Sequence, residues 1–84
     1  MDLSSIGRHI AERRKASRLS QATLAARAHV SLPGLKALEQ GRASEFGFAK
    51  LQRIVTALGL EFELREANRG RPTLDTLRSD QADD

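Results

Sequence analysis

Two serines, Ser20 and Ser31, each precede a short amphipathic run, and Gly41 follows the second of these runs. Serine is a preferred N-cap because its hydroxyl accepts a hydrogen bond from a free N–H of the first helical turn. The sequence therefore predicts two short helices, over residues 21–28 and 32–40. Only about three residues are left to join them, so the chain must turn tightly between the two helices.

Both runs place their apolar residues at helical spacing, so each helix is expected to bury one face. Pro33 falls in the first turn of the second helix, where its missing N–H costs no hydrogen bond. Gly41 stands just past the last turn, where a left-handed backbone is favoured. The residues expected inside are Leu24, Ala25, Ala28, Leu35 and Leu38.

Longer helices are predicted on either side of this pair. The first covers about residues 4–17, with Asp2 or Ser4 as its cap. The last covers residues 48–58 and ends at Gly59. The sequence thus predicts an all-α domain of four to five helices. Inward positions are expected at Leu3, Ile6, Ile10 and Ala11 in the first helix, and at Phe48, Leu51, Ile54, Val55 and Leu58 in the last.

The apolar period changes after residue 59. Leu60, Phe62 and Leu64 alternate with charged residues, which is typical of a half-buried strand over residues 60–65. A single strand leaves its backbone N–H and C=O groups unpaired, and the sequence offers no second strand. A two-fold copy of the same segment would pair them, so the pattern predicts a homodimer. A helical or frayed segment is the alternative.

Composition bounds the domain organisation. Eighty-four residues with 39% hydrophobic content support one small core. Residues 1–66 are expected to form the domain. Residues 67–84, which have few apolar side chains and end acidic, are expected to form a mobile tail.

The sequence has no cysteine, no signal-peptide pattern at its start and no run of about 20 apolar residues. We therefore expect a cytoplasmic protein without a membrane partner.

Charge is distributed unevenly along the chain. Residues 1–59 carry ten basic and four acidic side chains, a net charge of +6. Residues 60–84 carry four basic and seven acidic side chains, a net charge of −3. A basic body favours a polyanionic partner such as nucleic acid, although charge also keeps a small domain soluble.

No group of residues points to catalysis, a metal or a cofactor. His9 and Glu12 lie one helical turn apart, but two such ligands do not close a metal site. Glu61 and Glu63 share the charged face of the expected strand, where solvated edge charges are the better interpretation. The sequence also has no glycine-rich phosphate-binding motif. We expect a protein that is not an enzyme.

The chain resembles the helix-turn-helix family of the lambda repressor and Cro. The two short helices have the spacing of a helix-turn-helix unit, whose second helix meets DNA base edges. The resemblance extends in order and spacing over about residues 6–58. It is carried by the runs Ser20 to Ala25 and Leu38 to Gly41, by Val30, Ser31 and Leu35, and by the upstream run Ile6 to Arg14.

The resemblance implies roles for individual residues and a pseudo-palindromic double-stranded DNA operator as the partner. Gln21 opens the second helix, where the family touches the DNA backbone and supports the recognition helix. Arg42 follows the closing glycine, where the family commonly contacts phosphate. Arg14 and Glu39 match a structural ion pair between the first and third helices. The exposed recognition surface corresponds to Ser31, Leu32, Pro33, Gly34, Lys36 and Ala37.

Two departures from the family's pattern affect these expectations. His29 stands where the turn usually has glycine, and a left-handed backbone is plausible there because histidine tolerates it better than most residues. Leu32, Pro33 and Gly34 replace the usual polar residues of the recognition helix. Apolar side chains can contact thymine methyls but cannot form bidentate hydrogen bonds to bases. Readout would then rest on Lys36, on flanking residues or on DNA shape. The alternative is that Leu32 is merely exposed and that Pro33 merely starts the helix.

The end of the chain resembles HipB-type antitoxins. In those proteins a helix that ends like Thr56 to Gly59 precedes a strand that pairs with its twin across a homodimer. This assigns Leu60, Phe62 and Leu64 to dimerisation. The resemblance implies a repressor that autoregulates the operon of a HipA-like kinase toxin. A stand-alone regulator without a toxin and a protein-interaction module that has lost DNA binding are the alternatives.

Overall fold

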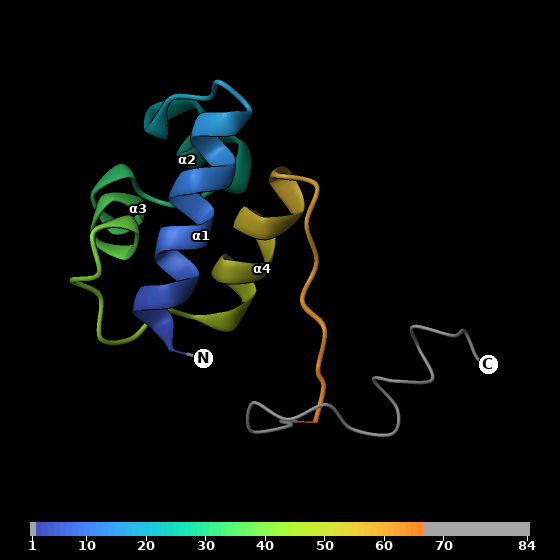
Figure 1. The fold of residues 1–84 in the computed structure, drawn as a ribbon. Coiled ribbons are helices and arrows are strands. Elements are labelled where there is room, and N and C mark those ends of the chain that lie inside the picture. Colours follow the sequence, from blue (N-terminus) through green and yellow to red (C-terminus); the bar gives the residue numbers. More distant parts are fainter. Residues whose placement is uncertain (1, 67–84) are drawn as a thin grey trace.

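The helices begin and end close to the residues that the sequence marks. The computed structural model describes residues 2–66, which form α1 (Leu3–Ala16), α2 (Gln21–Ala28), α3 (Leu32–Glu39) and α4 (Phe48–Ala57) (Figure 1). The prediction of an all-α domain is therefore confirmed, with four helices in this part of the chain. Among residues 2–66, no helix combines the length and the apolar character needed to cross a bilayer.

Side-chain caps begin α1, α2 and α3. Each cap oxygen accepts a hydrogen bond from a backbone N–H of the first turn, which would otherwise lack a partner in the helix. The bond from the Ser5 N–H holds the pKa of Asp2 below its ordinary value, because it stabilises the ionised carboxylate. The cap bonds join Asp2 to Ser5 at 2.8 Å, Ser20 to Thr23 at 3.0 Å and Ser31 to Gly34 at 3.0 Å.

All four helices are followed by a left-handed residue, and two of these residues are not glycine. Gly41 (φ 74°) and Gly59 (φ 76°) close α3 and α4, so the left-handed backbone expected at Gly41 is confirmed. Arg18 (φ 59°) and His29 (φ 57°) close α1 and α2, and the left-handed backbone expected at His29 is also confirmed. In each case the next N–H donates to a carbonyl five residues earlier, at 2.8 to 3.1 Å.

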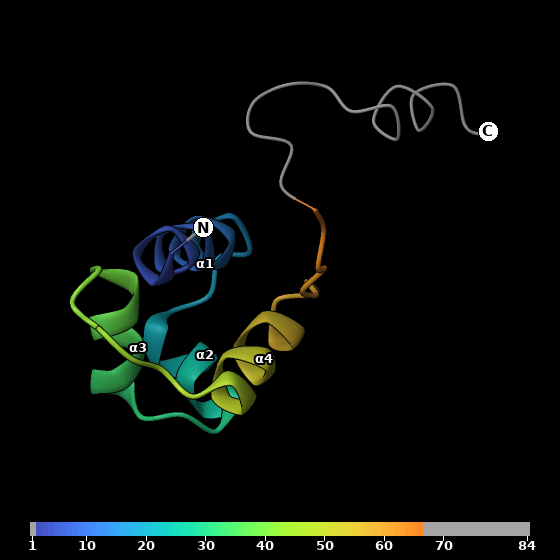
Figure 2. The same cartoon turned by 90° about the horizontal axis from the view of Figure 1, so that it is seen from below.

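The four helices enclose one apolar core. Helix α1 packs on α3, and α2 packs against both α3 and α4, as the view from below shows (Figure 2). The inward positions predicted in α2 and α3 are all buried. The side chains with the largest volume and almost no exposure are Ile10, Leu24, Leu35, Leu38 and Ile54.

Phe48 is an exception to the predicted core. It is 62% exposed, because the first residue of α4 lies at the edge of the core, and its ring stacks on Phe62 with the centroids 5.6 Å apart. The segment over residues 60–66 therefore runs back along α4 (Figure 1). Leu60 packs against the core, whereas Leu64 is fully exposed.

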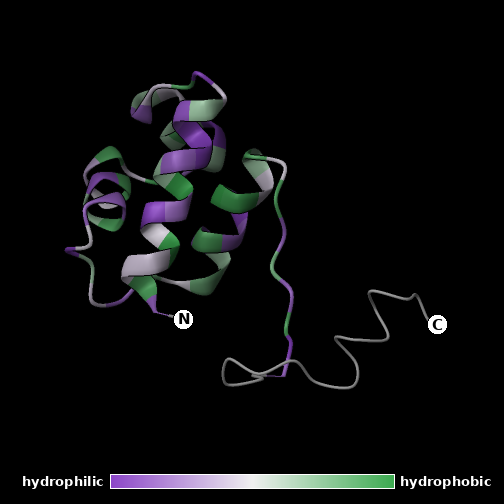
Figure 3. Cartoon of the chain, viewed as in Figure 1, coloured by the Kyte–Doolittle hydropathy of each residue, from purple (hydrophilic) through white to green (hydrophobic). Residues whose placement is uncertain are grey.

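The predicted strand is not formed within the described residues, since residues 61–66 have no regular secondary structure there. Hydrophobic and hydrophilic residues nevertheless alternate along this segment (Figure 3). A strand that pairs with its twin needs a second copy of the chain, so this pairing stays a prediction. The mobile tail predicted over residues 67–84 lies outside the described residues.

Candidate nucleic-acid interface

One face of α3 is open to solvent. Pro33, Lys36 and Gln40 are exposed and follow one another at three- or four-residue spacing, with Ala37 half-buried among them. The opposite face of the helix is buried in the core. A short helix with small and polar residues on its open face can enter the major groove of DNA.

Three residues predicted for the recognition surface, Leu32, Gly34 and Ala37, lie partly inside the protein. Leu32 packs against the hydrophobic core, and Gly34 is half-buried beneath the exposed Ser31, to whose hydroxyl its N–H donates. Leu32 is therefore not simply exposed, because part of its side chain belongs to the core, and its role in base readout stays a prediction. Pro33 and Lys36 are the predicted recognition residues with the most open positions within α3.

The loop after α3 extends this open face. Arg42 is exposed, and its Nε donates a hydrogen bond to Gln40 Oε1 at 2.8 Å. The sequence-based prediction did not include Gln40, although its spacing from Lys36 places both on one helical face. The bond occupies the carbonyl oxygen of the Gln40 amide and leaves its NH₂ group as a donor toward solvent.

A buried charged network ties α3 to the first two helices. Arg14 donates from Nε to Glu39 Oε2 at 2.8 Å and from Nη2 to Oε1 at 3.0 Å, a bidentate pair. The two side chains are only 11% and 4% exposed. A third donor, Gln21 Nε2, reaches Glu39 Oε1 at 2.9 Å, and Arg14 Nη1 also donates to the Leu19 carbonyl at 2.8 Å. The structure thus shows the ion pair that the resemblance implied between Arg14 and Glu39, and it adds Gln21, for which the resemblance implied a role at the DNA backbone, to the same network.

The network also limits what Gln21 can do at a DNA backbone. One hydrogen of its amide nitrogen is directed to Glu39, so a phosphate could be reached only by the second hydrogen or by the backbone N–H. That N–H belongs to the first turn of α2, where helical N–H groups lack intrahelical acceptors and favour anions. Gln21 is half-buried, which is compatible with both roles.

Gly7 permits the close crossing of α1 and α3, which sequence reasoning did not identify as a requirement. A Cβ at Gly7 would collide with the backbone carbonyl of Leu38, next to Glu39. A short-range pattern carries no sign of this contact, because a glycine inside a helix is ordinarily only a weak helix former. The crossing brings Arg14 within bonding distance of Glu39.

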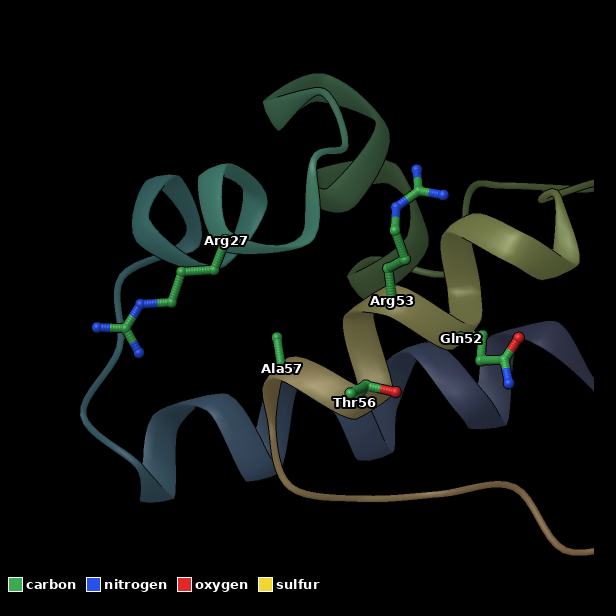
Figure 4. Close-up of a pocket in the computed structure, with 5 residues that line it drawn as sticks. All are labelled: Arg27, Gln52, Arg53, Thr56 and Ala57. Carbon is green, nitrogen blue, oxygen red and sulfur yellow. The ribbon is translucent and has the colours of Figure 1, made fainter.

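The turn between α2 and α3 receives two hydrogen bonds from α4. Arg53 donates from Nε to the Ala28 carbonyl at 2.8 Å and from Nη2 to the His29 carbonyl at 3.2 Å. In Figure 4 its side chain reaches from α4 toward this turn. Nothing in the local sequence signals the contact, since Arg53 and Ala28 are separated by 25 positions along the chain.

The surface of the helical body is strongly basic. Because Arg14 and Glu39 neutralise each other in the interior, the net charge of +6 of residues 1–59 rests on side chains that are exposed. Within residues 2–66 there is no cluster of three His, Asp or Glu residues that could hold a metal ion. The exposed basic side chains of the body are Arg8, Arg13, Lys15, Arg18, Arg27, Lys36, Arg42, Lys50 and Arg53, against exposed Asp2, Glu12 and Glu45.

The two short helices, their three-residue turn and the open face of α3 define a helix-turn-helix domain. A family model described as a helix-turn-helix domain matches residues 3–65, and the chain therefore belongs to this family. The family indicates a DNA-binding regulator. No curated protein and no solved structure shows a significant match to the chain.

Proposed function

We propose that the protein is a dimeric, sequence-specific DNA-binding repressor. The observation that carries this proposal is the open face of α3 on a body whose surface charge is basic. Duplex DNA is a dense polyanion, so basic side chains near its phosphates supply affinity for every sequence. Side chains of a helix in the major groove add discrimination between sequences.

The two kinds of contact fall to different residues in this proposal. Gln21 and Arg42 bind phosphates, together with the first-turn N–H groups of α2 and α3. Lys36 donates to guanine, and Gln40 to an acceptor on a base edge. Ala37 and the exposed part of Leu32 contact thymine methyls, with Ser31, Pro33 and Gly34 lining the same surface.

The segment over residues 60–66 supports a homodimer. Its apolar side chains become more exposed along the chain, from the half-buried Leu60 through Phe62, at 37%, to the fully exposed Leu64. A second copy paired along this segment would cover them and satisfy its backbone groups. Two copies would also present two α3 helices to half-sites about 34 Å apart on a pseudo-palindromic operator.

The finer proposal is an antitoxin that represses its own operon together with a HipA-like kinase toxin. It is supported by the resemblance of the α4 end and the following alternating segment to HipB-type antitoxins. A kinase-like reading frame next to the gene is expected. If the neighbouring reading frames include no kinase, the stand-alone regulator is the better description.

Competition binding at two salt concentrations tests DNA recognition. The duplexes are the DNA upstream of the protein's own coding region and a scrambled duplex of the same composition. Arg42→Ala should weaken binding to both and lower the salt slope by about one unit. Lys36→Ala should weaken binding to the upstream duplex more than binding to the scrambled duplex, by about 1–3 kcal/mol if Lys36 contacts guanine. Lys15→Ala, which removes an exposed lysine in the last turn of α1 that is not among the predicted DNA-binding residues, is the control for a lost charge.

The outcomes separate the roles of the two residues. Identical behaviour of Lys36→Ala and Arg42→Ala would make Lys36 a phosphate contact. If neither substitution changes binding relative to Lys15→Ala, α3 does not enter the groove and the proposed function is wrong.

Sedimentation tests the dimer. Phe62→Asp places a charge on the apolar face of the segment and should convert the dimer to a monomer, because burying an unpaired carboxylate is costly. Glu63→Ala, on the opposite face of the segment, should leave the dimer intact. A Phe62→Asp protein that sediments as an unchanged dimer would exclude pairing through residues 60–65.

A further inference from the structure

The three-residue turn between α2 and α3 decides where α3 points, yet its first residue is strained. His29 holds a left-handed backbone (φ 57°), which is unfavourable for a residue with a Cβ. Its side chain is exposed. Within the turn, the Val30 N–H donates to the Ala25 carbonyl at 3.0 Å and the Ser31 hydroxyl caps α3. The carbonyls of Ala28 and His29 are bound from outside the turn, by Arg53 of α4.

Arg53 has the chemistry that this position needs. The Ala28 carbonyl is among the last of α2, where helical carbonyls lack intrahelical donors and carry a partial negative charge. A guanidinium offers several N–H donors in a rigid plane, so it can bind two successive carbonyls in one fixed geometry. The two bonds fasten the turn to α4, which itself packs on α2.

We propose that Arg53 is a positioning residue for DNA recognition, which fixes the direction of α3 by holding the turn before it. The proposal rests on the DNA-binding function proposed above. In this role Arg53 contacts no base and acts through the His29 and Ala28 carbonyls. Its loss therefore affects the discrimination between DNA sequences more than the affinity for DNA in general.

Arg27 provides a matched comparison within the same groove. An open groove between α2 and α4 is lined by Arg27, Gln52, Arg53, Thr56 and Ala57. Figure 4 shows that Arg27 extends away from the turn, while Arg53 reaches toward it. The hydrogen bonds found among residues 2–66 include none from the Arg27 side chain to the turn. Both are exposed arginines of the same charge, so substituting either one removes an equal charge from the surface.

The first measurement needs no DNA. Residual dipolar couplings report the direction of α3 relative to α2 in the wild type, in Arg53→Met and in Arg27→Met. Methionine keeps an unbranched stem but lacks the donors. We expect the α3 couplings of Arg53→Met to depart from the wild-type orientation. The Val30 amide should exchange about tenfold faster, because the turn opens more readily without the bonds from Arg53. Arg27→Met should match the wild type in both.

The second measurement is the ratio of affinities for a selected duplex and for a scrambled duplex. The selected duplex is the upstream DNA, or one enriched from a random library with the wild-type protein. Both methionine variants should bind scrambled DNA with similar, slightly reduced affinity. Only Arg53→Met should lower the ratio, by about tenfold, the size of one lost base contact. Arg53→Lys, which keeps the charge but lacks the rigid fork, should give an intermediate ratio, and it serves if Arg53→Met does not fold.

Each outcome decides one statement. Unchanged α3 couplings in Arg53→Met would overturn the proposal, because the turn would then keep its conformation without the bonds from Arg53. Displaced couplings with an unchanged affinity ratio would overturn it as well. If the wild type prefers no duplex, the proposed DNA recognition fails, while the couplings still show whether Arg53 orients α3.

Discussion

The two ends of α3 are held in place by different chemistry. At its C-terminal end, Glu39 lies in the interior with Arg14 and Gln21, and Gly7 brings α1 into backbone contact. At its N-terminal end, the holding contacts are closer to solvent. They consist of the Ser31 cap, the left-handed His29 and the two bonds from Arg53.

This difference predicts that the two ends of α3 contribute unequally to the free energy of unfolding. Breaking a buried bidentate ion pair costs several kcal/mol, because the remaining charge stays buried, unpaired and unsolvated. An exposed cap or turn contributes about 1 kcal/mol. The C-terminal end should therefore control the stability of the fold, and the N-terminal end, which we propose faces the bases, should adjust at little cost to stability.

Gly7→Ala is expected to have the largest effect. The new methyl group would meet the Leu38 backbone carbonyl, which cannot rotate away, so α1 and α3 must separate. We expect a loss of unfolding free energy above about 3 kcal/mol, measured by thermal or urea unfolding at fixed protein concentration. Gly34→Ala is the matched control, since its nearest obstacle is the Ser31 hydroxyl at 2.8 Å, and should lie within about 1 kcal/mol of wild type. Equal losses of unfolding free energy in Gly7→Ala and Gly34→Ala would show that the close crossing of α1 and α3 has no special role in stability.

Arg14→Ala should have the second-largest effect, a loss of unfolding free energy of about 3 kcal/mol or more. Glu39 would keep only the bond from Gln21 in the interior. Arg13→Ala, its exposed neighbour, should stay within about 0.5 kcal/mol of wild type. Replacing both Arg14 and Glu39 by Met should cost less than Arg14→Ala alone, because no buried charge is left unpaired. A small effect of Arg14→Ala would show that the C-terminal end is not held by this pair.

Ser31→Ala tests the other end of α3 and should cost about 1 kcal/mol, because a first-turn N–H loses its acceptor. Ser44→Ala, in the exposed loop before α4, should have almost no effect. Urea unfolding of the two variants measures the difference. A loss for Ser31→Ala as large as that of Arg14→Ala would contradict the proposed difference between the two ends.

His29→Gly should have the smallest effect and the opposite sign. Glycine adopts the left-handed backbone without strain, so stability should rise by about 0.5–1 kcal/mol. Gly41→Ala, at the left-handed residue after the other end of α3, should instead lower stability by about 1 kcal/mol or more. If His29→Gly is destabilising, the histidine side chain contributes a contact beyond its backbone conformation. Calorimetry on both variants resolves effects of this size.

The helices could be predicted because their signals are local. A cap such as Ser20 acts within its own first turn, and a stop such as Gly41 acts within the last, so the neighbouring residues suffice to locate both. The apolar spacing of α2 and α3 identified their buried faces for the same reason. The same spacing predicts that Phe48 lies in the core. Its exposure depends on where the core ends, which the period of a helix does not contain.

The sequence by itself determined the four helices, the serine caps of α2 and α3, the left-handed turn and the resemblance that paired Arg14 with Glu39. Only the tertiary structure decided which contacts orient α3. The contacts of Gly7 with Leu38 and of Arg53 with the turn join residues far apart in the chain. They exist because helix packing brings these residues together, and no pattern within one helical turn encodes that approach.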